Sequence, residues 1–131
     1  KRESDPAPAV NVVEVPERMP PVDFAAEIMP ILQRSCLDCH SGEKPKGNYR
    51  MTNHMSLLHG GNRGGAAVIP GQSMDSLIVH VVTDQIEDLE MPPLTKRRKY
   101  PSLTHDEIAK VRAWVDQGAQ WPDGITFATD Q

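Results

Sequence analysis

The pentapeptide Cys36-Leu37-Asp38-Cys39-His40 constrains this chain more than any other feature of its sequence. Two thiols three positions apart can add across the two vinyl groups of a haem, and the imidazole that follows then lies beneath the iron as the proximal ligand. We therefore predict one covalent haem c, held by Cys36 and Cys39, with His40 bound to the iron. Aromatic residues make up only 5% of the chain, so a buried cofactor would also supply core volume.

Each competing interpretation of the cysteine pair has a defect. A thioredoxin-like dithiol should lie in a strand-then-helix context, which is missing here, and a disulfide across so short a span adds little by loop closure. A zinc site needs two further ligands at regular spacing, whereas the chain has no other cysteine. With both thiols used by thioethers, an oxidising compartment suits the chain, so we expect a periplasmic or otherwise exported protein.

Size and charge exclude other classes of function. The chain has 131 residues, enough for one domain. Its 18 acidic residues outnumber 14 basic ones and give a net charge of -4, which argues against a nucleic-acid partner. No stretch approaches the roughly 18 to 20 apolar residues of a membrane span. The chain lacks an initiator Met, so we expect a processed product or a piece of a longer chain.

Proline marks the start of the expected domain. Five prolines fall within residues 1–22, at positions 6, 8, 16, 20 and 21. Because proline fixes φ and removes a donor, this segment is predicted to be an extended tail or linker, able to tether the domain to a neighbour or a membrane anchor. We expect a monohaem domain over residues 23–122 and a C-terminal tail over residues 123–131.

Helical periodicity first appears behind Asp23, a plausible N-cap. Pro30 interrupts that pattern, and we expect a kink or a restart there. A second, short helix is predicted to follow Ser73 or Asp75 and to contain the apolar run from Leu77 to Val82.

The third predicted helix has the clearest signals. Thr104 and Glu107 form a capping box, and Gly118 marks the end. Between the first two helices, residues 41–72 hold seven glycines and are predicted to be irregular. Their glycines either permit close approach to a flat ligand or simply serve turn geometry. No strand alternation stands out, so the predicted fold class is mostly α.

The chain from Phe24 to Pro122 resembles the planctomycete-type cytochrome c domain. The matching residues are Pro30-Ile31-Leu32, the Cys36–His40 motif, Lys46-Gly47, Arg50-Met51, Leu57-Leu58, Gly60-Gly61, Gly64, Val68-Ile69-Pro70-Gly71, Ser76-Leu77, Met91-Pro92-Pro93, Trp114-Val115, Gly118-Ala119 and Trp121-Pro122. The resemblance implies a small class I-like cytochrome c fold, with about three main helices around one haem and with His and Met as axial ligands. We expect an electron carrier rather than an enzyme, serving a redox partner protein either alone or as one domain of a larger redox enzyme.

Met91 is the preferred sixth ligand of the iron. It lies between the last two predicted helices, as class I cytochromes would place it, in a loop that Pro92 and Pro93 stiffen. An ordinary core methionine is the other interpretation. His80 is the main rival, although we expect it to pack on its helix with a satisfied ring. The remaining histidines are expected in a solvated loop or at the surface: His54, His59 and His105.

Other residues could contact the cofactor. Arg50 and Arg63 could pair with the haem propionates, and the alternative is that both arginines are solvated. Trp114 and Trp121 could line the haem, although core packing is the safer expectation.

The run Lys96-Arg97-Arg98-Lys99 departs from the family pattern. Four consecutive positive charges in an otherwise acidic domain suggest a docking patch for an acidic redox partner, and the alternative is a solvated loop.

Two functional classes remain open. An electron-transfer module has both axial positions filled, whereas a haem enzyme or a gas or redox sensor keeps its distal position open. Met91 separates the two, because a rigid loop that supplies a ligand favours closed coordination.

Overall fold

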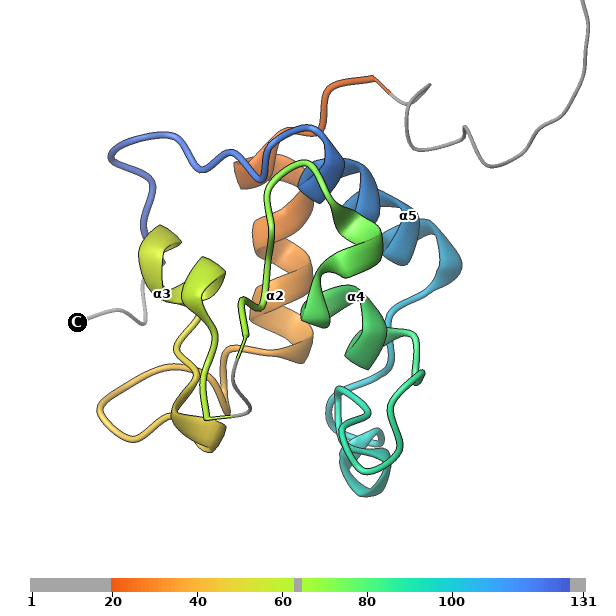
Figure 1. The fold of residues 1–131 in the computed structure, drawn as a ribbon. Helices are drawn as coiled ribbons and strands as arrows, with labels where there is room; N and C mark the ends of the chain where they lie inside the picture. Colours follow the sequence, from red (N-terminus) through yellow and green to blue (C-terminus); the bar gives the residue numbers. More distant parts are fainter. Residues whose placement is uncertain (1–19, 63–64, 128–131) are drawn as a thin grey trace, which may run out of the picture.

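The computed structural model describes residues 20–62 and 65–127. Over these ranges it contains four α-helices and no strand: α2 (Met29–Ser35), α3 (His54–His59), α4 (Leu77–Val82) and α5 (His105–Asp116) (Figure 1). Single helical turns occur at Phe24–Ile28, Lys46–Asn48, Ser73–Asp75 and Leu94–Lys96. The predicted mostly α fold class is confirmed. No helix in the described ranges is long and apolar enough to cross a membrane.

The first helical segment begins and restarts where the sequence predicts. A side-chain oxygen of Asp23 accepts a hydrogen bond from the backbone N–H of Ala26 at 3.2 Å, and one π-helical turn follows. Pro30 then lies in the first turn of α2, where a missing N–H costs nothing. α2 ends at Ser35, so Cys36 is its C-cap and the first residue of the motif emerges directly from a helix.

α5 confirms the predicted capping box. The hydroxyl of Thr104 accepts from the Glu107 N–H at 3.1 Å, and the Glu107 carboxylate accepts from the Thr104 N–H at 2.9 Å. The helix ends just before Gly118, whose φ of 109° suits glycine.

The predicted cap of α4 is wrong. Ser73 and Asp75 belong to a separate turn, and Ser76 occupies the N-cap position without a side-chain cap bond. The Ser76 hydroxyl instead donates to the Gln72 carbonyl at 2.9 Å and accepts from the Ile69 N–H at 2.8 Å.

The sequence interpretation missed α3. Asn53 caps this helix through a 2.9 Å bond from the Ser56 N–H, within the segment expected to be irregular. The expectation that His54 lies in a solvated loop is therefore wrong: its ring is half-buried, and Nε2–H donates to the Ala119 carbonyl at 2.9 Å. The shortness of α3, six residues between glycine-rich stretches, explains why periodicity did not reveal it.

An aromatic cluster fastens the two ends of the described chain together. The ring centroid of Phe24 lies 4.4 Å from that of Trp121, 5.6 Å from Trp114 and 6.4 Å from Phe127. Trp114 and Phe127 are almost fully buried, and each such side chain contributes about 2–3 kcal/mol by leaving water. Core packing of both tryptophans is confirmed. Packing also continues past the expected domain boundary at residue 122, because Phe127 completes this cluster.

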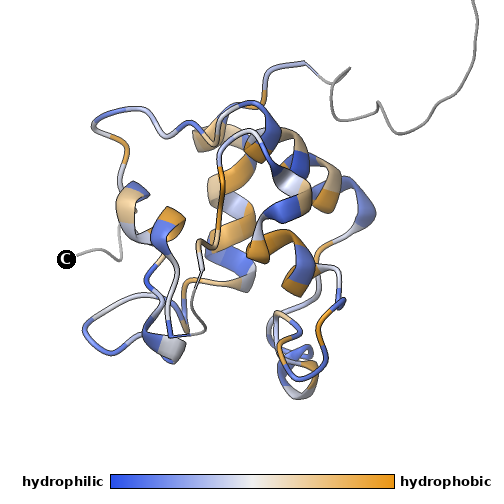
Figure 2. Ribbon diagram, in the orientation of Figure 1, coloured by the Kyte–Doolittle hydropathy of each residue, from blue (hydrophilic) through white to orange (hydrophobic). Residues whose placement is uncertain are grey.

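Two loop regions extend from the helical centre on the same side of the molecule (Figure 1). One contains residues 40–53, which lead into α3 (His54–His59), together with residues 60–62 that follow it, and the other contains residues 84–100 and follows α4. Hydrophobic residues are prominent in α2 and α4, above these loops (Figure 2).

Candidate functional site

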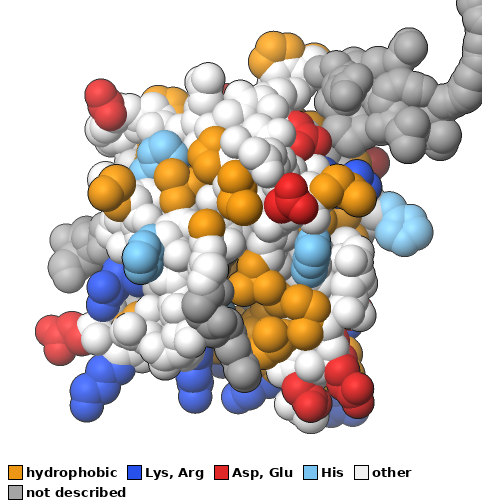
Figure 3. Space-filling view, in the orientation of Figure 1, with side chains coloured by type: hydrophobic (Ala, Val, Ile, Leu, Met, Phe, Trp, Pro, Cys, Tyr) orange, Lys and Arg blue, Asp and Glu red, His pale blue; other side chains and the backbone are white. Residues whose placement is uncertain are grey.

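A cavity of about 390 Å³ is lined by residues of both loop regions and by residues of α4. Its size falls within the range of about 300–1,000 Å³ that ligand sites occupy. Figure 3 shows hydrophobic side chains gathered in a recess at this place. The apolar part of the wall comes largely from α4 and its neighbours: Ala67, Leu77, Ile78, Val81, Val82 and Leu89.

The structure brings Cys36, Cys39 and His40 together on the wall of this cavity. The chain turns as it leaves α2, with the Cys39 and His40 N–H groups both donating to the Cys36 carbonyl, at 3.2 and 3.1 Å. This turn aims the two sulfurs and the imidazole at one space. Both cysteines carry free thiols.

His40 is held in one orientation and one tautomer. Its Nδ1–H donates to the Tyr49 carbonyl at 2.9 Å, which leaves Nε2 as the nitrogen that can bind a metal. Burial lowers the pKa of His40, so the neutral ring required of a ligand is favoured. The ring of Tyr49 packs beside it, with centroids 5.3 Å apart. Sequence reasoning missed Tyr49, because a backbone carbonyl leaves no signal in the residue type.

The Cys36 thiol does not suit dithiol redox chemistry. Burial raises its pKa to about 12, whereas cysteines that exchange disulfides have a lowered pKa. The Cys36 side chain is half-buried and lies on the cavity wall.

Two methionines line the cavity, Met91 and Met51. The Met51 N–H donates to the His40 carbonyl at 2.8 Å, so Met51 belongs to the loop region that holds the imidazole. The Met91 N–H donates to the Val81 carbonyl at 2.9 Å, at the end of α4, so Met91 enters from the other region. Met55 and Met74 are largely exposed, at 80% and 70%.

The rival histidines lie outside the cavity lining. His80 packs on its own side of α4 with a satisfied ring, as expected: its Nε2–H donates to the Met74 carbonyl at 2.6 Å. His105 is exposed at the start of α5, and His59 is exposed at the end of α3.

Arg50, one of the two arginines expected near the propionates, is not among the described residues that line the cavity. The Arg50 guanidinium donates to the Gly42 carbonyl, through Nε at 2.9 Å and also through Nη2, so its pairing with a propionate stays a prediction. Arg63 lies outside the described residues. The polar lining includes Lys46 and Lys96, which the sequence analysis named for other reasons, and three residues that it did not name: Asn62, Asp88 and Tyr100.

The basic run is not one continuous patch. Lys96 lines the cavity, Arg98 is exposed, and the Lys99 ammonium lies 5.5 Å from the Tyr100 ring centroid. Arg97 turns back to Asp84, and its hydrogen bonds hold the pKa of that carboxyl below its usual range.

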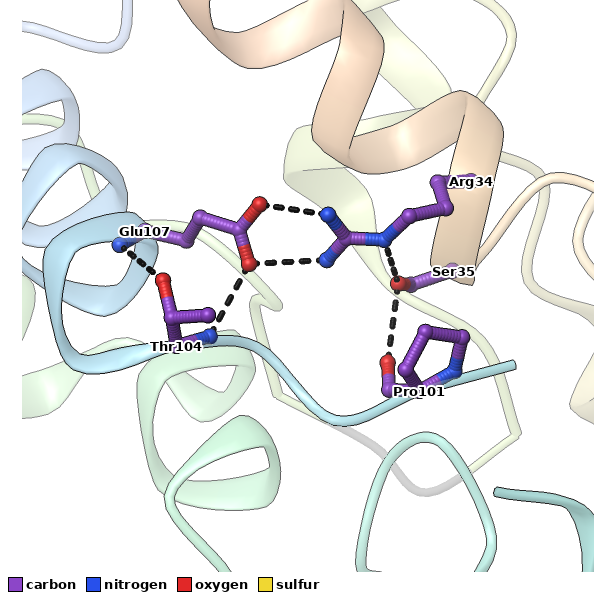
Figure 4. A network of polar contacts seen from close by, with 5 residues as sticks. All are labelled: Arg34, Ser35, Pro101, Thr104 and Glu107. Carbon is purple, nitrogen blue, oxygen red and sulfur yellow. Dashed lines mark hydrogen bonds and ion pairs between the residues drawn. The ribbon is translucent and has the colours of Figure 1, made fainter. Parts of the chain in front are cut away.

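A polar network fixes the helix that precedes the motif (Figure 4). Arg34 forms two hydrogen bonds with the Glu107 carboxylate, at 2.5 and 2.7 Å, and the Ser35 hydroxyl donates to the Pro101 carbonyl at 3.0 Å. The hydrogen bond from Arg34 is the main reason that the pKa of Glu107 falls to about 2. The end of α2 is thereby tied to the start of α5.

The donor set fits haem c. Two thiols, a neutral imidazole with Nε2 available and a thioether meet at one largely apolar cavity, which suits a flat macrocycle and its iron. By contrast, residues 20–62 and 65–127 contain no cluster of three or more His, Cys, Asp or Glu side chains that could hold a zinc ion.

Comparison with known families agrees with this chemistry. Residues 36–94 match the family model described as Planctomycete cytochrome C, which confirms the expected resemblance over a segment that contains both the motif and Met91. Cytochrome c domains bind haem c, exchange electrons with redox partners, are generally carriers and are typically exported. No curated protein and no solved structure matches the chain.

Proposed function

We propose that this chain, whose residues 36–94 match the planctomycete cytochrome c family, is an exported single-electron carrier with one haem c. Cys36 and Cys39 would hold the haem by thioether bonds, and His40 and Met91 would bind its iron. One observation carries the proposal: His40 and Met91 reach the same apolar cavity from separate loop regions.

Attachment needs no oxidant. Each thiol adds across one vinyl group, so that a carbon–sulfur bond forms and the thiol hydrogen passes to the other vinyl carbon. Cys36 and Cys39 line the same cavity and carry free thiols, as this addition requires.

The surrounding residues tune the site for electron transfer. The bound haem supplies an iron that gains and loses one electron. The Tyr49 carbonyl orients the His40 imidazole, and the Met91 thioether, a weaker donor than an imidazole or carboxylate, favours the ferrous state. Val81, Val82 and Leu89 keep water from the cavity and disfavour the extra charge of the ferric state.

The haem content has a direct test. Mass spectrometry of the denatured protein, expressed with the haem-attachment machinery, should show one covalent haem, and Cys36→Ala/Cys39→Ala should show none. An unmodified wild-type chain would overturn the attachment.

The distal ligand is tested by Met91→Ala, with Met51→Leu as the matched control because both methionines line the cavity. Met91→Ala should abolish the weak far-red sulfur-to-iron absorption band, lower the midpoint potential and let carbon monoxide bind the reduced iron. Met51→Leu should keep the band. The reverse pattern would move the ligand to Met51, and ready carbon monoxide binding by the wild type would favour an enzyme or a sensor with an open distal position.

A further inference from the structure

We propose that Arg97 is a positioning residue, which closes the loop that carries Met91 and so sets how firmly the thioether is held. This inference rests on the proposed function, because it takes Met91 as the distal ligand. It also gives a role to one member of the basic run that the family resemblance leaves unexplained.

The Arg97 guanidinium makes three hydrogen bonds to two distant points of the same loop. Nε donates to the Pro92 carbonyl at 2.8 Å. Nη1 and Nη2 donate to the two carboxylate oxygens of Asp84, at 3.1 and 2.7 Å. The Arg97 side chain is 22% exposed, so it lies against the protein rather than in solvent.

These contacts lie on both sides of the proposed ligand. Asp84 follows the end of α4, and Pro92 is the next residue after Met91. The Met91 N–H is itself held by the Val81 carbonyl at 2.9 Å. Arg97 therefore ties the segment after Met91 back to the helix that anchors the segment before it. Without this tie, the loop has one fewer restraint against moving the thioether out of the cavity.

The chemistry requires arginine rather than any cation. A planar guanidinium can bind a carboxylate with two N–H groups and still offer Nε to a carbonyl, whereas an ammonium is a compact point charge. Arg98, the next residue along the run, is exposed and has the same side chain. It provides a control with the same change of charge but without the described contacts of Arg97.

The experiment measures how easily imidazole displaces the internal ligand from the ferric holoprotein. Arg97→Gln should bind imidazole roughly three- to tenfold more tightly than wild type, the size expected when charge-assisted, partly exposed hydrogen bonds are lost. Asp84→Asn should also bind imidazole more tightly than wild type. Arg97→Lys should have an imidazole affinity between those of Arg97→Gln and the wild type. The far-red band should also disappear at lower temperature in Arg97→Gln.

Two controls separate positioning from general loss of stability. Arg98→Gln should leave the imidazole affinity unchanged. Glu107→Gln removes a comparable two-bond ion pair that joins α2 to α5, makes no hydrogen bond to the Met91 loop and has neither partner in the cavity lining, so it should lower the free energy of unfolding and leave the imidazole affinity unchanged. If Arg97→Gln matches either control in imidazole affinity, Arg97 does not position the ligand.

The outcomes distinguish this inference from the proposed function. If Met91→Ala loses the far-red band while Arg97→Gln behaves like Arg98→Gln, the inference alone fails. If Met91→Ala keeps the band, the ligand assignment fails, and the role of Arg97 toward that ligand fails with it. Amide hydrogen exchange over residues 85–96 then still decides whether the tie exists, because Arg97→Gln should speed exchange there and Arg98→Gln should not.

Discussion

Tyr49 supports His40 through its backbone and its ring together. The carbonyl accepts from Nδ1–H, and the ring packs beside the imidazole. The phenol in turn donates to the Leu57 carbonyl at 2.7 Å, and burial raises the pKa of Tyr49, so the hydroxyl stays a donor at ordinary pH. Tyr49 thereby links His40, the proposed proximal ligand, to α3.

We predict that Tyr49→Phe costs about 1–2 kcal/mol of unfolding free energy, because the Leu57 carbonyl loses a buried donor. Urea unfolding measures this loss. The far-red band should persist, since the Tyr49 carbonyl that orients His40 is retained. Loss of that band would mean that the hydroxyl, and not only the backbone, fixes the ligand.

At the scale of single residues, the sequence predicts those whose function follows from the residue type alone. Cys36, Cys39 and His40 lie within five residues, so one pattern contains the whole of the proposed proximal side, and two prolines follow Met91 directly. The role of Arg97 depends on the chain returning to Asp84 and Pro92, and that of Tyr49 on a backbone carbonyl. Neither role can be predicted from residue type or from spacing along the chain.

Among the elements, the loop of residues 46–49 and the loop of residues 60–62 pack directly on each other. The Asn62 N–H donates to the Gly47 carbonyl at 2.8 Å. A Cβ on Gly61 would lie 2.8 Å from the Tyr49 Cβ and closer still to the Gly47 carbonyl oxygen. Glycine at position 61 therefore serves contact between these two loops, and both loops line the cavity.

We predict that Gly61→Ala destabilises the fold by about 1–3 kcal/mol, since the added carbon must push the two loops apart. It should also change the circular dichroism of the haem Soret band, because Tyr49 moves with its loop. Gly42→Ala is the control: it adds a Cβ in open space at a φ of 77° and should affect stability only. Identical Soret spectra for both variants would contradict this role of Gly61.

Element prediction succeeded where caps and periodicity agree. α5 has a capping box and a full apolar face, and its start follows from Thr104 and Glu107. α3 has only Asn53 as a local signal and one fully buried residue, Leu57, so its stability comes from tertiary contacts. Tertiary contacts likewise bury Phe127, which lies in no helix and so has no helical periodicity around it to predict its place in the core.

For the whole molecule, the pair of Arg34 and Glu107 joins α2 to α5 and makes stability depend on acid. The Glu107 pKa falls from 4.5 to about 2 on folding. Because the Glu107 pKa is lower in the folded state, the ion pair stabilises the fold at pH values above the pKa of the unfolded chain. This contribution is complete above about pH 4.5 and is lost as the pH falls towards 2.

We predict that the wild type exceeds Glu107→Gln in unfolding free energy by about 1 kcal/mol at pH 6, allowing for solvent around the partly exposed pair. The difference should vanish near pH 2. Glutamine can keep the capping box, so the comparison isolates the ion pair. Urea unfolding of both proteins across this range measures it, and a constant difference would exclude the assigned titration.

The distribution of charge sets how the molecule meets a redox partner. The net charge is -4, yet Lys46 and Lys96 line the cavity, and Arg98 and Lys99 lie close to Lys96 in the sequence. With Arg97 engaged by Asp84, the docking hypothesis depends on the other three residues of the run. Because screening limits the interaction of exposed charges to distances of roughly 8 Å at physiological ionic strength, a partner close to the cavity is influenced more by these local charges than by the net charge.

We predict that Lys96→Glu slows oxidation of the ferrous protein by ferricyanide, an anionic reagent that must approach the cavity. The effect should be roughly tenfold at low ionic strength and about twofold at physiological salt, as screening weakens the repulsion. Lys110→Glu makes the same change in net charge on α5, away from the cavity lining, and should slow the reaction much less. Stopped-flow rates over a salt series measure both variants, and equal slowing would show that net charge, rather than the charge beside the cavity, governs electron exchange.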